Sequence, residues 1–302
     1  MLTISYMWIV LAILAGIISA AGMLLNQYFK VPGLLLVLLS RFFTLSLLLP
    51  MAFFITWPTS PVYYAAVIVT GLTAGFADIR TYNVTAELGG GVVSRLIPLL
   101  VPVTFVTWFI FAPSQLTDYL EAPVKSLGII TALSGCVYFA SRLQSTCHIS
   151  KDALKWMTPT ILAYGLNGAM AKLALNNAPV NAGVYGYVFI QTILVIIPTA
   201  YYCFHKEKKR GKDHPDSYIP HINKKLLVAA GLASFFWVTH MASKMYAFTL
   251  IDNPAYVNAV VLLAPIWIIL FYKIIGHKEE ANITAGIGIL ISTIFLVIMT
   301  AK

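Results

Sequence analysis

Long apolar segments recur along the whole chain, and they constrain its fold more than any other feature of the sequence. A helix needs about 20 apolar residues to cross the roughly 30 Å of hydrocarbon in a bilayer. Ten segments of this kind can be drawn, separated by short connections rich in Pro, Gly or charge. We therefore predict ten membrane-spanning helices, at residues 4–27, 32–56, 60–82, 89–112, 124–141, 154–174, 182–203, 225–247, 253–275 and 281–300.

The composition excludes a soluble protein. Only 10% of the 302 residues are charged and 59% are hydrophobic, whereas soluble domains carry about 25% charged residues. The connections between the segments are too short to hold a soluble domain. The sequence also contains no H-E-x-x-H, G-x-S-x-G or Walker A motif, so we expect neither an enzyme nor a bound metal or cofactor.

The Lys and Arg residues are distributed unevenly between the predicted connections. Counting Lys125, Lys155, Lys225 and Lys273 at the segment ends with the connections, thirteen of the 20 follow odd-numbered segments, two lie on the opposite side, and five lie within segments. Positive residues concentrate on the cytoplasmic side of membrane proteins. We therefore predict cytoplasmic odd-numbered connections and both termini on the opposite side. Because the net charge of +9 follows this pattern, we expect no nucleic-acid partner.

The second half of the chain repeats features of the first. LIPLLVPVTFVTWFIFA at 96–112 is similar to AVVLLAPIWIILFYKII at 259–275, LLLP at 47–50 to VIIP at 195–198, and LLNQ at 24–27 to ALNN at 174–177. Five spans followed by five similar spans place the second copy upside down in the membrane, which is the plan of many secondary transporters. The predicted fold is an all-α integral membrane protein with ten transmembrane helices in two inverted five-helix repeats, residues 1–150 and 151–302.

These segments resemble a known transporter family. SRFFTLSLLLP at 40–50 resembles the arginine-bearing second helix of EamA-type transporters, and the segments at 96–112 and 259–275 resemble the fourth and ninth helices. Each of the latter is followed by a Gly-containing last helix, SLGIITALSGCVYFA or AGIGILISTIFLVI. The chain is identified on this resemblance as a member of the drug/metabolite transporter superfamily. The resemblance implies export or exchange of a small metabolite by alternating access, and we expect the inner (plasma) membrane of a bacterium.

Five cations lie within the predicted spans, where acids are fewer. They are Arg41, Arg80, Arg95, Lys172 and Lys244. Arg41 lies nine residues into its span, about 14 Å from the end at 1.5 Å per residue, which is too deep for its charge to reach the membrane surface easily. The other four lie nearer span ends, where a long side chain can extend to the surface. The excess of buried base favours an anionic or zwitterionic metabolite, such as an amino acid or an organic or nucleotide-like anion.

Two groups of polar residues stand at helical spacing in spans three and eight. Trp237, His240 and Lys244 at i, i+3 and i+7 share one helical face, as do Asp78 and Tyr82 at i and i+4. The offset of 163 residues between the repeat motifs LLVP and LLAP places the two groups at equivalent heights, so we expect them to face each other. A structural hydrogen bond or ion pair is the alternative interpretation of these positions, and Asp78 is either a counter-ion or a coupling carboxylate.

The predicted substrate-binding residues are the members of these two groups, two of the buried cations, and two residues of span nine. They are Arg41, Asp78, Tyr82, Lys172, Trp237, His240, Lys244, Tyr256 and Asn258. Arg41 and Lys244 are expected to hold the anionic group, while the aromatic residues stack on the substrate or line its cavity. His240 and Asp78 are expected to set protonation or to pair charges.

Three other functions stay open on the sequence. A flippase for a lipid-linked group requires a cavity open sideways to lipid. A membrane enzyme or lipid-modifying protein would bind phospholipid heads with the basic residues. A scaffold or receptor subunit would dock a cytosolic partner on the polar stretch at 205–225. For a transporter, the expected partners are the metabolite and the lipid bilayer. The chain is expected to be a monomer or a homodimer.

Overall fold

The structure, a computed structural model, describes residues 6–88, 90–143, 150–210, 222–275 and 282–300. Within these residues every regular element is a helix, and no strand is present. The elements in chain order are α2 (Met7–Phe29), α3 (Gly33–Leu48), the 3-10 helix η1 (Leu49–Phe53), α4 (Pro61–Leu88), α5 (Gly90–Leu96), the 3-10 helix η2 (Ile97–Leu99), α6 (Leu100–Phe111), α7 (Pro113–Glu121), α8 (Pro123–Arg142), α9 (Lys151–Asn176), α10 (Val180–Arg210), α11 (Lys224–Thr249), α12 (Pro254–Val261), α13 (Ala264–Ile275) and α14 (Ile283–Thr300).

Nine stretches of the described chain are long and apolar enough to cross a membrane. They are Met7–Leu25, Gly33–Phe53, Pro61–Thr85, Val92–Phe111, Pro123–Arg142, Val180–His205, Lys224–Thr249, Pro254–Phe271 and Ile283–Thr300. Each overlaps one of the predicted spans, so the prediction of an all-α, multi-pass membrane protein is confirmed. Of the polar stretch at 205–225, residues 211–221 lie outside the described residues.

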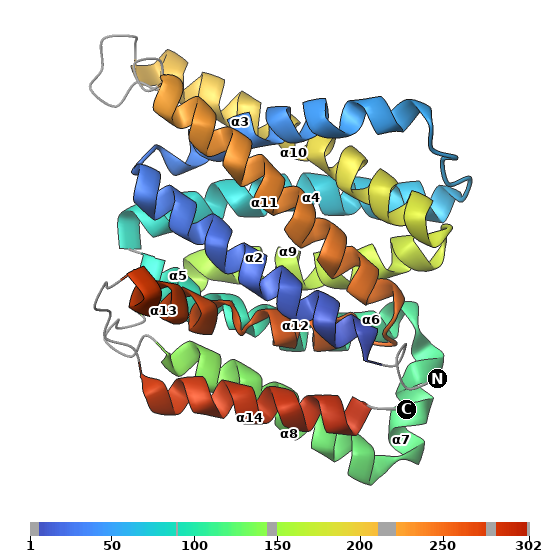
Figure 1. Cartoon of the computed structure of the whole chain (residues 1–302). Coiled ribbons are helices and arrows are strands. Elements are labelled where there is room, and N and C mark those ends of the chain that lie inside the picture. Colours follow the sequence, from blue (N-terminus) through green and yellow to red (C-terminus); the bar gives the residue numbers. More distant parts are fainter. Residues whose placement is uncertain (1–5, 89, 144–149, 211–221, 276–281, 301–302) are drawn as a thin grey trace.

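The sixth predicted span, 154–174, is helical but is not one of the nine apolar stretches. It belongs to α9, a helix of 26 residues that buries the polar side chains of Thr160, Asn167 and Lys172. α9 lies behind α2 and α11 in Figure 1, and it packs on α4, α6 and α12. Because protein covers much of its surface, α9 needs less apolar character than a helix that faces lipid.

Side-chain caps determine where two of the long helices begin. Ser150 accepts a hydrogen bond of 3.0 Å from the backbone N–H of Ala153 at the start of α9. Asn223 accepts one of 3.0 Å from the N–H of Leu226 at the start of α11. The first N–H groups of a helix have no partner within it, so a side-chain oxygen at this position stabilises the helix end.

The helices run back and forth between two sides of the molecule (Figure 1). On the left of that view lie the ends of α2, α8, α10 and α13 and the starts of α3, α9, α11 and α14. These ends flank the connections to which the sequence assigns thirteen of its 20 basic residues. The start of α2 and the end of α14 lie on the opposite side. The basic connections therefore begin and end on one side of the molecule.

Two crossings are broken instead of being continuous helices. The first consists of α5, η2 and α6, with Pro98 in the 3-10 turn. The second consists of α12 and α13, which are interrupted at residues 262–263. Proline removes a backbone donor and clashes with the preceding turn, which explains breaks near proline. The predicted offset of 163 residues relates Leu99, the last residue of η2, to Leu262 in the second break.

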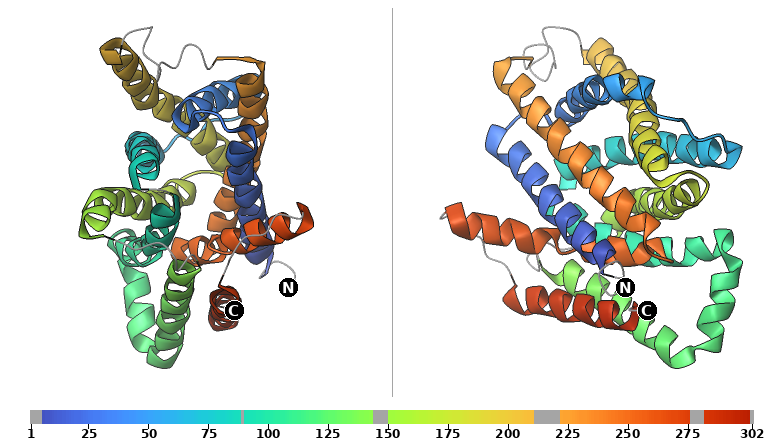
Figure 2. Two further views of the ribbon diagram at one scale, coloured as in Figure 1. Left: turned by 90° about the vertical axis from the view of Figure 1, so that its left-hand side faces the viewer. Right: turned by 45° about the vertical axis from the view of Figure 1, so that its right-hand side comes forward.

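The helix packing places one interior region between α3, α4, α10 and α11. α3 contacts the other three, and α10 contacts both α4 and α11. α2 lies along α11 on the near side of this region in Figure 1, and α9 lies along α4. α8 and α14 pair at the lower edge of the molecule, away from this region, as both views of Figure 2 show.

Candidate functional site

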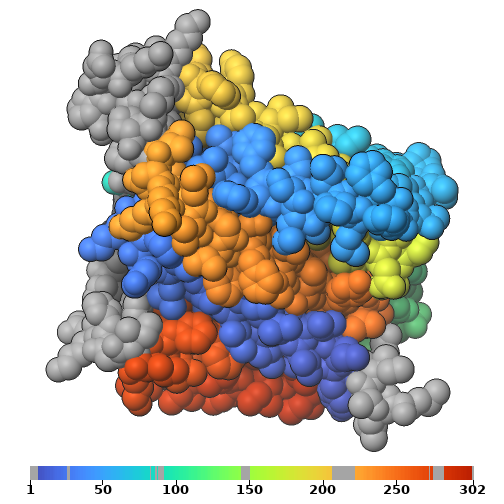
Figure 3. All heavy atoms as spheres, turned by 45° about the horizontal axis from the view of Figure 1, so that its top comes forward, coloured from blue at the N-terminus to red at the C-terminus, as the bar shows by residue number. Residues whose placement is uncertain are grey.

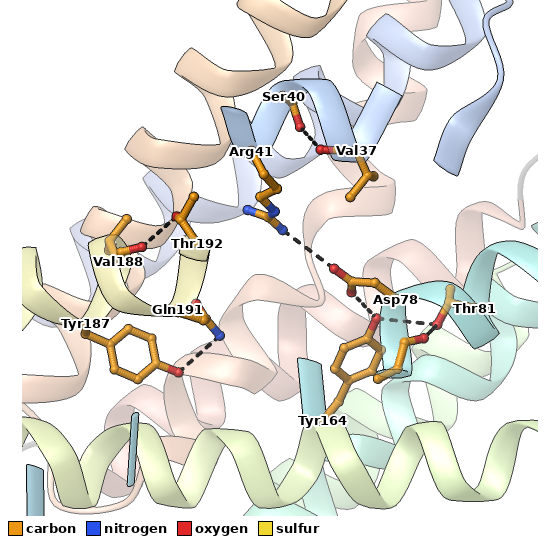
Figure 4. Close-up of polar contacts among 11 residues, drawn as sticks. Val37, Ser40, Arg41, Asp78, Thr81, Tyr164, Tyr187, Val188, Gln191 and Thr192 are labelled. Atoms are coloured by element: carbon orange, nitrogen blue, oxygen red, sulfur yellow. Dashed lines mark hydrogen bonds and ion pairs between the residues drawn. The ribbon is translucent and has the colours of Figure 1, made fainter. Parts of the chain in front are cut away.

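Arg41 forms a buried ion pair between α3 and α4. It is the ninth residue of α3, and its side chain is only 8% exposed. One guanidinium nitrogen, Nη2, lies 3.6 Å from Oδ2 of Asp78 on α4 (Figure 4). A charge at this depth in a membrane protein is costly unless it is paired, and such residues mark functional sites by default. Asp78 is thus a counter-ion of Arg41, which was one of the two roles expected for it.

Trp237 on α11 provides the second contact of the Arg41 side chain. The guanidinium carbon lies 3.6 Å from the centroid of the Trp237 ring. An arginine over an indole face gains cation–π attraction, which is stronger away from water. Arg41 therefore contacts one residue from each of the two groups expected to face each other, Asp78 and Trp237.

A tyrosine from α9 holds the other oxygen of the carboxylate. The Tyr164 hydroxyl donates a hydrogen bond of 2.7 Å to Oδ1 of Asp78 (Figure 4). Its oxygen also lies 3.4 Å from Oγ1 of Thr81, whose own proton goes to the carbonyl of Ala77 at 2.8 Å. The carboxylate thus has a hydrogen-bond donor at one oxygen and a cation at the other. The sequence did not assign Tyr164 to the site, and the only available signal was a hydroxyl within a span.

Gln191 on α10 completes the polar surroundings of this region. Its Nε2 donates a hydrogen bond of 3.4 Å to the Tyr187 hydroxyl one helical turn earlier. Its Oε1 is buried and has no hydrogen-bond partner among the described residues. Figure 4 shows Gln191 across the interior from Asp78, with the Arg41 side chain entering from α3 between them. Gln191 is not among the residues that the sequence predicts for the site.

The other cations of the predicted site lie nearer the end of α11. Lys172 of α9 is buried, and its ammonium donates a hydrogen bond of 2.7 Å to the carbonyl of Phe248. Lys244 places its ammonium 5.5 Å from the centroid of the Phe248 ring. Nδ1 of His240 lies 2.9 Å from the carbonyl oxygen of Ala15 on α2. Lys244 and His240 thus follow Trp237 along α11, as their spacing predicted.

Two of the predicted site residues, Tyr256 and Asn258, lie on α12 in the second broken crossing. The Tyr256 hydroxyl contacts that of Tyr119 on α7. Burial raises the pKa of the Tyr119 phenol, and the nearby charges of Asp252 and Asp118 raise it further, so Tyr119 keeps its proton at neutral pH.

The remaining predicted residue of this crossing has a packing contact. Nδ2 of Asn258 donates a hydrogen bond of 3.2 Å to Oγ1 of Thr104 in the other broken crossing. The side chain of Tyr82 lies outside the described residues. Among the described residues, no three His, Cys, Asp or Glu side chains gather in a group that could hold a metal ion.

Comparisons with known proteins establish the fold alone. No protein-family model matches the sequence, and no curated protein matches it. Ten chains of solved structures match the fold. One of them, a crystal structure of a protein, has 13% sequence identity and a TM-score of 0.56, and the match covers 99% of this chain and 98% of the other. The architecture thus extends over the whole length of a second protein.

Proposed function

We propose that the chain is a secondary transporter of the EamA type within the drug/metabolite transporter superfamily. Its substrate is a small anionic or zwitterionic metabolite, such as an amino acid or an organic or nucleotide-like anion. The observation that carries this proposal is the buried Arg41, whose guanidinium lies between the Asp78 carboxylate and the Trp237 ring. A guanidinium binds carboxylate and phosphate groups by paired hydrogen bonds, so a substrate anion can replace Asp78.

The surroundings of Arg41 support an exchange of partners. When a substrate anion takes the guanidinium, Asp78 keeps the hydrogen bond from Tyr164, so the displaced carboxylate retains a donor. Trp237 keeps the guanidinium in place through the exchange. Lys244 and Lys172 add positive charge farther along the interior. Binding of the substrate at Arg41 thus changes the contacts among α3, α4 and α11, and this change couples binding to closure of the helices around the substrate.

The architecture that accompanies this proposal is a ten-helix inverted repeat, with halves at residues 1–150 and 151–302. α9 supplies the tenth crossing. Paired broken helices at corresponding positions of two halves are typical of secondary transporters, and the breaks near Leu99 and Leu262 differ by the repeat offset. The basic side of the molecule is the cytoplasmic side of a bacterial inner membrane, and both termini lie on the opposite side.

Reconstitution in liposomes tests the proposal. Exchange would be measured for 4-phenylbutanoate, L-leucine and AMP, which represent an organic anion, a zwitterion and a nucleotide-like anion. Arg41→Gln should abolish exchange of every probe that the natural protein transports. Arg142→Gln is the matched control, because Arg142 is an exposed residue in the last turn of α8.

Folding of each variant is checked by its melting temperature in detergent. Exchange that persists in a folded Arg41→Gln protein would contradict the proposal. Chemical conversion of a probe without its accumulation in vesicles would indicate a membrane enzyme instead. Movement of a fluorescent phospholipid between leaflets, without exchange of soluble probes, would indicate a flippase.

A further inference from the structure

A cavity of about 510 Å³ lies between α3 and η1, the first turns of α10, and the second half of α11. This volume falls within the range of about 300–1,000 Å³ that is usual for small-molecule sites. Figure 3 shows α3 and η1 in blue beside α11 in orange on this face of the molecule. The lining residues lie near the end of α3 and the start of α10, and these helix ends are on the right in Figure 1.

The lining of the cavity is predominantly apolar. Nine of its twelve residues are aliphatic, Met or Phe, and three carry a hydroxyl or amide: Asn181, Tyr185 and Tyr246. Two hydrogen bonds within the protein engage these groups: Tyr246 donates to Oδ1 of Asn181 at 3.0 Å, and Tyr185 donates to the carbonyl of Leu48. A water molecule needs two to four polar partners, so this cavity favours a hydrocarbon group over water.

The cavity shares one face of α3 and one face of α10 with the site around Arg41. Leu48, which lines the cavity, is seven residues after Arg41 on α3 and therefore lies on the same face, about 10 Å along the axis. Val188 lines it one helical turn before Gln191 on α10. On α11, Val238 lines the cavity and follows Trp237, which contacts the guanidinium; the two side chains point about 100° apart around the helix.

We infer that this cavity is the subsite for a hydrocarbon group of the transported molecule. The substrate is then an amphipathic organic anion, with its carboxylate or phosphate at Arg41 and an aromatic or branched aliphatic group between Leu48, Val188 and Val238. This inference rests on the proposed function, because it takes Arg41 as the anion-binding group. A lipid acyl chain matches the lining but makes no use of the buried cation on the same face of α3.

The test compares three probes that share one carbon skeleton. They are 4-phenylbutanoate, butanoate, which lacks the ring, and 4-phenylbutan-1-ol, which lacks the charge. Binding is measured as the concentration that gives half of the maximal rise in melting temperature of the purified protein. We expect 4-phenylbutanoate to act at a concentration at least tenfold lower than either of the other two probes.

Variants that fill the cavity separate the two parts of the site. Val238→Phe and Val188→Phe place a ring in the cavity from two different helices, and Val228→Phe on exposed α11 surface is the matched control. The filled variants should bind 4-phenylbutanoate only as weakly as butanoate, with butanoate binding unchanged. If one filled variant does not fold, the other provides the comparison, and Ala242→Val narrows the cavity by a smaller change.

The outcomes for the subsite and for the proposed function are distinct. Arg41→Gln should remove binding of both acids, and if it leaves both unchanged the proposed function fails. If Arg41→Gln removes both but the ring brings no gain in affinity, or filling the cavity does not reduce that gain, the subsite is wrong and the anion site stands. Loss of a co-purified phospholipid from the filled variants, with 4-phenylbutanoate binding unchanged, would assign the cavity to a lipid chain and overturn the inference.

Discussion

Tyr164 on α9 donates a hydrogen bond of 2.7 Å to Oδ1 of Asp78 on α4, and this leaves Oδ2 to face Arg41 at 3.6 Å. The two oxygens of one carboxylate are therefore divided between a neutral donor and a cation. If a substrate anion takes Arg41, the Tyr164 bond determines how readily Asp78 gives it up, because a buried carboxylate without a donor is strongly disfavoured.

Tyr164→Phe should therefore weaken substrate binding without removing the anion site. Hydrogen bonds to charged groups contribute about 1.5–3 kcal/mol, so the dissociation constant of a transported anion should rise about tenfold or more. Titration of the purified variant with 4-phenylbutanoate measures this constant. Tyr201→Phe, at a side chain that is 72% exposed on α10, serves as the control. Unchanged affinity in Tyr164→Phe would show that Asp78 does not give up Arg41 when the anion binds.

Asp78→Asn should destabilise the fold, because it keeps an acceptor for Tyr164 but removes the negative charge beside Arg41. Breaking a buried pair from one side costs about 3–5 kcal/mol, whereas removing both charges can be nearly neutral. The double variant Arg41→Gln with Asp78→Asn should thus be more stable than Asp78→Asn alone, while anion exchange stays absent. Melting temperatures of the four proteins give the comparison. A double variant less stable than both single variants would mean that the two charges are not coupled.

The spans and the depth of Arg41 were predictable from the sequence because both depend on local patterns. Runs of about 20 apolar residues mark crossings, and a charge in the middle of such a run has no route to water. The helical spacing of Trp237, His240 and Lys244 also placed them correctly along α11. Their partners were not predictable, since a shared face covers several neighbours: Trp237 contacts Arg41, and His240 lies beside Ala15.

The contribution of α9 shows why the rest of the site escaped prediction. Tyr164 and Asp78 are 86 residues apart, and their contact depends on how α9 crosses α4, which helical periodicity does not encode. Gln191 gave the same weak signal as any amide in a span, and its place opposite Asp78 depends on the packing of α10 against α3 and α4. Arg41 itself was expected to bind substrate directly, and its position between the polar groups of two other helices follows only from the packing.

Lys172 and Lys244 should respond differently to removal of their charge. Lys172 is buried and donates to the Phe248 carbonyl at 2.7 Å, so Lys172→Met should cost about 1–3 kcal/mol of stability by leaving that acceptor unsatisfied. The Lys244 ammonium contacts the Phe248 ring instead, at 5.5 Å from its centroid. Lys244→Met should keep the melting temperature and lower the affinity for anions severalfold, because it removes a positive charge from the interior. A loss of stability in Lys244→Met, together with a loss of anion affinity but not of stability in Lys172→Met, would exchange the structural and functional roles of the two lysines.

Gly168 lies where α9 crosses the two broken helices, and an added methyl group there should disturb both packing and the site. A Cβ at Gly168 would lie 2.8 Å from Cγ2 of Thr104 and 3.0 Å from Nδ2 of Asn258. Gly168→Ala should therefore cost about 1–3 kcal/mol, as overpacked cores do. Because Tyr164 is one helical turn earlier on the same face of α9, a shift of this helix should also weaken its bond to Asp78 and reduce anion affinity.

Gly231→Ala on α11 is the matched control, since a Cβ there meets nothing within 4 Å. Alanine is favoured over glycine within a helix by roughly 0.5–1 kcal/mol, so this variant should be as stable as the natural protein or slightly more stable. Melting temperature and 4-phenylbutanoate affinity measured on both variants distinguish local crowding from the general effect of replacing glycine. A Gly168→Ala protein that matches Gly231→Ala in both measurements would show that α9 can move away from Thr104 without any effect on Tyr164.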